Sequence, residues 1–155
     1  MNLIELVKTY EREISDDSIL VEYDLYFKEV AVNRCKFVID VHEELQILKD
    51  VFLKLMAKDK NAEIYVNTYS MDFTEENTYI YADSLWIDTI LDVEEIYNLF
   101  SDSRKVEPTD IILLEDDETV DGTISLVMMA DGKVRDYKTF IKRKQLCKIK
   151  SLYWD

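Results

Sequence analysis

Apolar residues recur with the spacing of an α-helix in three stretches of the chain. The first runs from Leu3 to Ile14, the second from Val41 to Leu55 and the third from Val93 to Phe100. In each stretch apolar side chains return every three or four positions, which places them on one side of a helix. The second stretch has the widest apolar face, so we expect it to form the central core helix.

A helix-start signal precedes each of these stretches. Asn2, Asp40 and Asp92 are each followed three positions later by a glutamate. At this spacing the first side chain accepts a hydrogen bond from a free backbone N–H while the glutamate reaches back. We therefore predict three helices that begin at these positions.

Elsewhere apolar and polar positions alternate, or β-branched and aromatic residues gather in short runs, which is typical of strands. These segments are residues 19–27, 30–39, 63–67, 78–81, 85–90, 111–114, 124–130 and 134–140. The pair Asp131-Gly132, which is favoured in a two-residue type I′ turn, predicts a hairpin between the last two segments. Residues 141–155 fit neither period well, and we interpret them as a closing strand.

Together these elements predict an α+β fold in which about three helices pack on a mainly antiparallel, twisted β-sheet. A chain of 155 residues fits one domain and buries roughly 68–70% of its unfolded surface without a metal or disulfide. Because 12% of the residues are aromatic, the acidic groups are expected to coat a packed core rather than to mark a disordered chain. No linker-like stretch interrupts the sequence, so we predict a single domain over residues 1–155.

Cysteine usage and apolar run length bear on the cellular compartment. Cys35 and Cys147 lie far apart and form no Cys-x-x-Cys motif, which favours reduced, buried thiols in a reducing compartment. The longest apolar run, residues 126–130, is far shorter than the about 18 residues that a membrane-spanning helix needs. We expect a cytoplasmic protein that does not associate with membranes, and the sequence does not predict its oligomeric state.

Charge is segregated along the chain. The formal net charge is -14, but residues 1–132 carry -20 while residues 133–155 carry +6. Blocks of one sign steer association toward partners of the opposite sign, whereas catalysis needs particular groups at particular spacings. The charge pattern therefore favours a binding surface over a reaction centre.

Several catalytic and metal-binding motifs are excluded by composition. With only Gly122 and Gly132, the chain cannot supply the glycine-rich phosphate loops or the G-x-S-x-G nucleophile elbow. His42 is the only histidine, which excludes a two-histidine zinc site, and no spacing identifies a catalytic partner for it. The acidic stretch before Gly122 is not an EF-hand, because Met128 stands where a bidentate glutamate is required. We predict no metal, cofactor or catalytic residue.

Two alternatives concern nucleic acid. Pro108-Thr109-Asp110 followed by Asp136-x-Lys138 loosely matches a metal-dependent nuclease, in which two carboxylates bind Mg²⁺ and a lysine stabilises phosphate charge. The basic run 142–144 with its aromatic neighbours has the residue types of a nucleic-acid-binding module. The overall negative charge of the chain repels phosphate and disfavours both interpretations. We therefore expect these basic side chains to pair with acidic ones or to protect a sheet edge.

A tyrosine-rich sheet face offers a surface for protein binding. If residues 63–71 and 78–82 form a hairpin, Tyr65 and Tyr69 share a face of one strand, and Tyr79 and Tyr81 share a face of the other. An exposed tyrosine face gives large contact area at low entropic cost. The alternative is that a helix covers this face as a second core; the sequence does not decide between the two.

These observations favour a non-catalytic protein that binds a basic protein partner. Its predicted contact residues are the four tyrosines and the acidic stretch, which comprises Glu115, Asp116, Asp117, Glu118 and Asp121. In its small size, acidity and expected compartment the chain is similar to bacterial immunity proteins and to antitoxins of basic nuclease toxins. The similarity is one of class, because no stretch of the chain matches a motif of those families. It implies an inhibitor of a basic protein.

Overall fold

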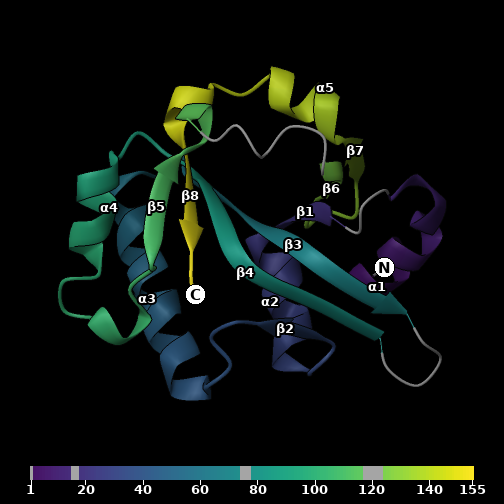
Figure 1. Ribbon diagram of the computed structural model, residues 1–155, viewed down its shortest axis with the longest axis horizontal. Coiled ribbons are helices and arrows are strands. Elements are labelled where there is room, and N and C mark those ends of the chain that lie inside the picture. The colour runs from purple at the N-terminus through teal and green to yellow at the C-terminus, as the bar shows by residue number, and fades with distance from the viewer. Residues whose placement is uncertain (1, 15–17, 74–77, 117–123) are drawn as a thin grey trace.

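The computed structural model describes residues 2–14, 18–73, 78–116 and 124–155 (Figure 1). Its α-helices are α1 (Leu3–Thr9), α2 (Tyr23–Ala31), α3 (His42–Lys58), α4 (Val93–Leu99) and α5 (Tyr137–Lys142). Its strands are β1 (Ser18–Glu22), β2 (Cys35–Phe37), β3 (Glu63–Phe73), β4 (Thr78–Asp88), β5 (Asp110–Leu113), β6 (Ile124–Met128), β7 (Val134–Asp136) and β8 (Ile149–Tyr153). Short 3-10 turns are η1 (Glu11–Glu13), η2 (Arg104–Val106), η3 (Leu114–Asp116) and η4 (Leu146–Lys148).

The strands form one open, mostly antiparallel sheet in the order β5-β8-β4-β3-β1-β6-β7, with β2 beside β4. The long β3–β4 hairpin is its centre, and only the β1–β6 and β2–β4 pairs are parallel. Strand β4 is paired along both halves of its outer edge, by β8 over Ser84–Asp88 and by β2 over Ile80–Ala82. The predicted α+β class and the mainly antiparallel sheet are confirmed.

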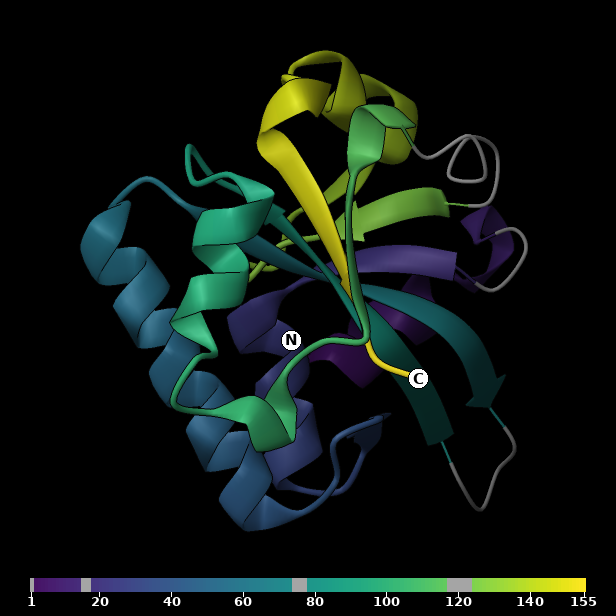
Figure 2. The ribbon, with the colours of Figure 1, turned by 60° about the vertical axis from the view of Figure 1, so that its left-hand side comes forward.

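The two faces of the sheet carry separate apolar cores. Helices α1 to α4 pack on one face, where the larger core includes Val66 of β3 and Leu85 of β4. Helix α5 packs on the opposite face, where a smaller core includes Tyr65 of β3 and Trp86 of β4. Alternate residues of the central hairpin thus point to opposite cores, as the pleat requires. Figure 2 shows α3 and α4 together on one side and α5 at the far end of the sheet.

The described residues contain five α-helices, not about three, because two segments predicted as strands are helical. The predicted strand 19–27 ends at Glu22 and continues as α2, and the predicted strand 134–140 ends at Asp136 and continues as α5. Of the predicted strand 30–39, only Cys35–Phe37 is extended. Both helices are rich in aromatic residues, whose β-propensity is overridden by packing against the sheet. The buried Tyr26 hydroxyl shows this, since it donates to the backbone carbonyls of Lys36 and Ile80.

Two of the three predicted helix starts are confirmed. The Asn2 and Asp92 side chains accept from the backbone N–H groups of Glu5 and Glu95, and Asp92 forms a complete capping box. The prediction for Asp40 is wrong, because α3 begins at His42 and its N-cap is Val41, which has no capping side chain. Spacing alone did not reveal that this helix starts one residue later than an Asp40 N-cap would place it.

The predicted Asp131-Gly132 hairpin is present between β6 and β7, but its turn is of another type. Met129 and Lys133 close the loop, and the Gly132 N–H donates to the Met129 carbonyl at 2.9 Å. Gly132 has φ +88°, whereas Asp131 is not among the described residues with positive φ. Ala130, Asp131 and Gly132 therefore form a three-residue loop that ends in a left-handed glycine. The closing strand predicted within 141–155 is β8.

Candidate partner-binding groove

Two hollows flank helix α3 and share Gln46 and Lys49 in their walls. The first hollow has a volume of about 360 Å³ and lies between α2, β2 and the start of α3. The second has a volume of about 720 Å³ and lies between the start of α2, the middle of α3 and the start of β3. Because both shared residues lie on α3, the two hollows adjoin one another along this helix, and we refer to them together as the groove along α3.

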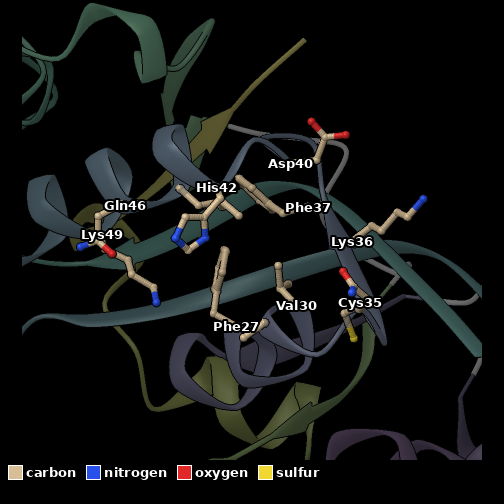
Figure 3. Close-up of a pocket in the computed structure, with 12 residues that line it drawn as sticks. Phe27, Val30, Cys35, Lys36, Phe37, Asp40, His42, Gln46 and Lys49 are labelled. Atoms are coloured by element: carbon tan, nitrogen blue, oxygen red, sulfur yellow. The ribbon is translucent and has the colours of Figure 1, made fainter.

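The first hollow is lined by both His42 and Cys35, which Figure 3 shows on different sides of it with Val30 between them. His42 and Phe27 point toward one another across it, while Asp40 and Lys36 point away. Cys35 lines the same hollow from β2 and is 2% exposed. Burial, with a smaller contribution from the Glu29 carboxylate, raises the pKa of the Cys35 thiol far above its ordinary value. The thiol therefore stays protonated, and Cys35 does not provide the thiolate that cysteine nucleophiles need.

The second hollow combines an apolar wall with an acidic rim, and we call it the acidic hollow. Phe52, Leu53 and Met56 of α3 and Ile64 of β3 form the apolar wall. Glu22, Asp24 and Glu63 supply the carboxylates of the rim. The junction of β1 and α2 positions the first two, because Glu22 ends the strand and Asp24 lies in the first turn of the helix.

The carboxylates of the rim differ in their partners. Glu63 accepts a hydrogen bond from the Tyr65 hydroxyl at 3.0 Å and is paired with Lys144, which also lies 3.3 Å from Asp88. Glu22 and Asp24 form no ion pair with any residue that the structure describes. The negative charge without a direct counter-ion is thus concentrated on the β1–α2 junction.

The Glu22 carboxyl lies in an unfavourable electrostatic environment. Burial is the largest cause that raises its pKa, and the carboxylates of Asp131, Glu63 and Asp24 raise it further. A hydrogen bond from the Ala130 backbone N–H opposes this shift in part. A cation placed at the rim would lower the electrostatic energy of this group of carboxylates.

Tyr23 lies between Glu22 and Asp24 in the sequence and carries an unsatisfied polar atom. Its hydroxyl is buried and has no hydrogen-bond partner among the described residues. Its ring packs on Phe27 at 4.6 Å and on Phe52 at 5.5 Å between centroids. Burial raises the pKa of this phenol, so it remains a hydrogen-bond donor and acceptor that is not in use.

The tyrosines predicted as a binding face have different environments. Tyr65 lines the acidic hollow but is only 4% exposed, because α5 covers it and the Phe140 ring lies 5.2 Å away. Of the two alternatives for the tyrosine face, coverage by a helix is therefore the correct one at Tyr65. Tyr81 is half-buried in β4 beside Lys36 of β2. The backbones of Tyr69 and Tyr79 lie in β3 and β4, and the structure does not describe their side chains.

The predicted acidic stretch is only partly described. Glu115 and Asp116 are exposed in η3, while Asp117, Glu118 and Asp121 lie outside the described residues. Register places η3 at the same end of the sheet as the acidic hollow, because Leu113, Lys150, Ile87 and Ile64 form one row across β5, β8, β4 and β3. The start of this stretch and the acidic hollow are therefore neighbours, about three strand spacings apart.

The structure does not bring the nuclease candidates together. Asp110 lies in β5 at one edge of the sheet, and Asp136 and Lys138 lie at the other edge in β7 and α5. Six strand spacings, on the order of 25–30 Å, separate the two carboxylates. Asp136 caps α5 by accepting from the Thr139 N–H at 3.1 Å. Within the described ranges no three histidine, cysteine or acidic residues are grouped as metal ligands would be.

The basic C-terminal segment is divided between surface and interior. Arg135, Lys138, Lys142 and Arg143 are exposed. Lys150 is 3% exposed and donates to the carbonyls of Thr89 and Lys148, and its burial lowers the pKa of the ammonium group. Lys144 pairs with Glu63 and Asp88, which agrees with the expectation that basic side chains of this segment pair with acidic ones. Cys147, expected to be buried, is exposed.

Sequence reasoning missed the triplet Glu22-Tyr23-Asp24. The segment was interpreted as a continuous strand, in which Glu22 and Asp24 would share one face and Tyr23 the other. Only the change from β1 to α2 at Tyr23 gathers all three around one hollow. Two carboxylates beside an aromatic residue were the signal available in the sequence.

Comparisons with protein-family models, with curated proteins and with solved structures yield no match to this chain. Among the described helices, none combines the length and the apolar character that crossing a membrane requires. The geometry of the groove and the distribution of charge are therefore the basis for a functional proposal.

Proposed function

We propose that this chain is a non-catalytic binding protein that captures a basic segment of a protein partner. The observation that carries the proposal is the acidic hollow, in which an apolar wall stands beside carboxylates that have no direct counter-ion. Apolar surface supplies affinity, and charge of one sign selects a partner of the other sign. An immunity protein or antitoxin-like inhibitor of a basic toxin is the biological form of this function that we favour.

Capture proceeds in two physical stages. The field of residues 1–132, with a net charge of -20, attracts a basic partner from beyond contact distance. Short-range contacts in the groove along α3 then hold the partner after the surrounding water is displaced. Salt screens the first stage much more than the second, because the screening length is about 10 Å at 0.1 M ionic strength.

The test is partner capture from the native lysate on the immobilised chain, followed by binding kinetics with the purified partner. We expect the captured proteins to be basic and the association rate to fall steeply between low and physiological salt. A binder of neutral or acidic charge, or association that ignores salt, would refute the proposal. The neighbouring gene provides a separate check on the toxin inhibitor role, since a toxin-like reading frame immediately upstream is expected there.

A further inference from the structure

We infer that the acidic hollow binds an arginine side chain of the partner together with the apolar residue next to it. The inference rests on the proposed function and assigns its contact point. The occupant is a short basic and apolar segment of a protein, identified by the charge of the rim and the apolar character of the wall. The volume of about 720 Å³ lies in the range of small-molecule sites and holds more than one side chain.

The apolar wall is exposed where a surface helix normally carries polar residues. Leu53 is 67% exposed and Met56 is 37% exposed, and their spacing of three places them side by side on α3. Both line the acidic hollow, with Ile64 on the facing strand. An apolar side chain of a partner, and the aliphatic stem of an arginine, would remove this surface from water.

The rim favours a guanidinium over an ammonium group. Glu22 and Asp24 offer carboxylate oxygens. Tyr23, the residue between them in the sequence, also lines the hollow, and its hydroxyl has no hydrogen-bond partner among the described residues. A guanidinium is planar, carries five N–H donors and stacks on aromatic rings, so it can serve several acceptors at once. Aromatic rings of Tyr23 and Phe52 border the same space.

Two lysines, Lys144 and Lys49, lie near the acidic hollow and partly neutralise its negative charge. Lys144 is held by Glu63 and Asp88, and Lys49 lines the border with the first hollow. Asp131, which adds to the field at Glu22, lies 3.9 Å from Lys133. Glu22 and Asp24 remain without a direct ion pair among the described residues, and they are the carboxylates that we assign to the incoming guanidinium.

A fluorescein-labelled peptide of twelve residues that alternates arginine and leucine tests this assignment by fluorescence anisotropy. Matched peptides carry lysine, or the neutral isostere citrulline, in place of arginine. We expect the arginine peptide to bind most tightly, the lysine peptide less tightly and the citrulline peptide least. Leu53→Ser and Asp24→Asn should each weaken the arginine peptide by about tenfold, since each removes one contact of roughly 1.4 kcal/mol.

The chain offers matched controls for both variants. Ile90 has the same exposed fraction as Leu53, 67%, but lies outside the acidic hollow, and Asp102 is an exposed carboxylate after α4. Ile90→Ser and Asp102→Asn should change affinity by less than about twofold. Tyr23→Phe should weaken the arginine peptide without lowering the melting temperature, because it removes a buried hydroxyl that lacks a partner in the free protein.

The outcomes separate this inference from the proposed function. Both cationic peptides could bind in a salt-sensitive way that Leu53→Ser, Asp24→Asn and Tyr23→Phe do not change. That result would overturn the assignment to the acidic hollow, but it would leave the proposed capture of a basic partner intact. Failure of the unmodified chain to bind either cationic peptide at low salt would overturn both. Equal weakening by the hollow variants and by their controls would also overturn the assignment.

Discussion

At the scale of single residues, Asp59 joins the end of α3 to the segment between β4 and α4. Its carboxylate accepts from the Thr89 hydroxyl at 2.7 Å, the Ile90 N–H at 3.0 Å and the Asn61 N–H at 3.1 Å. The residue is 7% exposed. The hydrogen bond from Thr89 is the largest cause that lowers the pKa of Asp59, and those from Ile90 and Asn61 lower it further, so the ionised carboxylate stabilises the fold.

Asp59→Ala should lower the free energy of unfolding by about 3 kcal/mol, because three donors lose a charged acceptor and one of them is a buried hydroxyl. Urea denaturation at pH 7 measures the loss. Asp50→Ala is the control, since Asp50 is an exposed carboxylate on the same helix. That variant should stay within about 0.5 kcal/mol of the unmodified chain, and an equal loss in both would show that the Asp59 contacts contribute little.

The same carboxylate predicts a pH dependence. A lowered pKa in the folded state means that the stabilisation is complete above the unfolded pKa of about 3.9 and is lost as pH falls through the lower folded value. The stability advantage of the unmodified chain over Asp59→Asn should therefore be constant from pH 7 to about pH 5 and shrink below about pH 4. Denaturation of both proteins across this range gives the difference. An advantage that grows in acid would contradict the assigned sign.

At the scale of elements, α3 shows what periodicity detects and α2 shows what it misses. The apolar face of α3 repeats over seventeen residues, which no strand can imitate. Helix α2 has only nine residues, of which Leu25, Tyr26 and Phe27 are consecutive and buried. Such a run fits a buried strand equally well, and only contacts with β2 and β4 from other parts of the chain decide its conformation.

The candidate site is subject to the same limit, because some of its residues lie in the segment that periodicity does not assign correctly. The acidic and aromatic character of the proposed binding surface follows from composition, and Tyr65, though buried, lines the hollow. The residues that form its rim could not be predicted, because Glu22 and Asp24 meet at the hollow only when the chain changes from strand to helix at Tyr23. The pairing of Lys144 with Glu63 was equally hidden, since it joins positions 81 residues apart.

The N-terminus of α3 gives a prediction of increased stability. Its N-cap, Val41, has extended backbone dihedral angles and is 51% exposed, but it provides no side-chain acceptor. Val41→Asp should raise the free energy of unfolding by about 1 kcal/mol, because the carboxylate can accept from a free N–H and interact with the positive end of the helix. Thermal or urea denaturation measures the gain.

Val32 supplies the matched control for this variant. It is 56% exposed and caps the C-terminus of α2, where a negative charge meets the negative end of the helix. Val32→Asp should therefore bring no gain in stability. If both substitutions raise stability equally, relief of exposed apolar surface rather than helix capping is the cause.

At the scale of the whole molecule, the topology keeps the two charge blocks partly apart. The exposed basic residues Arg135, Lys138, Lys142 and Arg143 belong to β7 and α5 at one edge of the sheet. Glu115 and Asp116 follow β5 at the opposite edge, and the acidic hollow lies between these limits at the start of β3. A basic partner of the kind proposed would be attracted to the acidic hollow and the β5 edge and repelled by the edge formed by β7 and α5.

This arrangement predicts opposite effects of two charge reversals on the association rate of a basic partner. Changing Glu115 and Asp116 to lysine should slow association, because it removes negative charge near the acidic hollow, and changing Lys142 and Arg143 to glutamate should speed it. All four side chains are exposed, so the melting temperature should stay nearly constant in both variants. Stopped-flow or surface-based kinetics at low and physiological salt measure the rates, and both effects should diminish as salt rises. If the Lys142 and Arg143 reversal instead slows association, the basic edge is itself a contact surface, and the partner is recognised by acidic rather than basic groups.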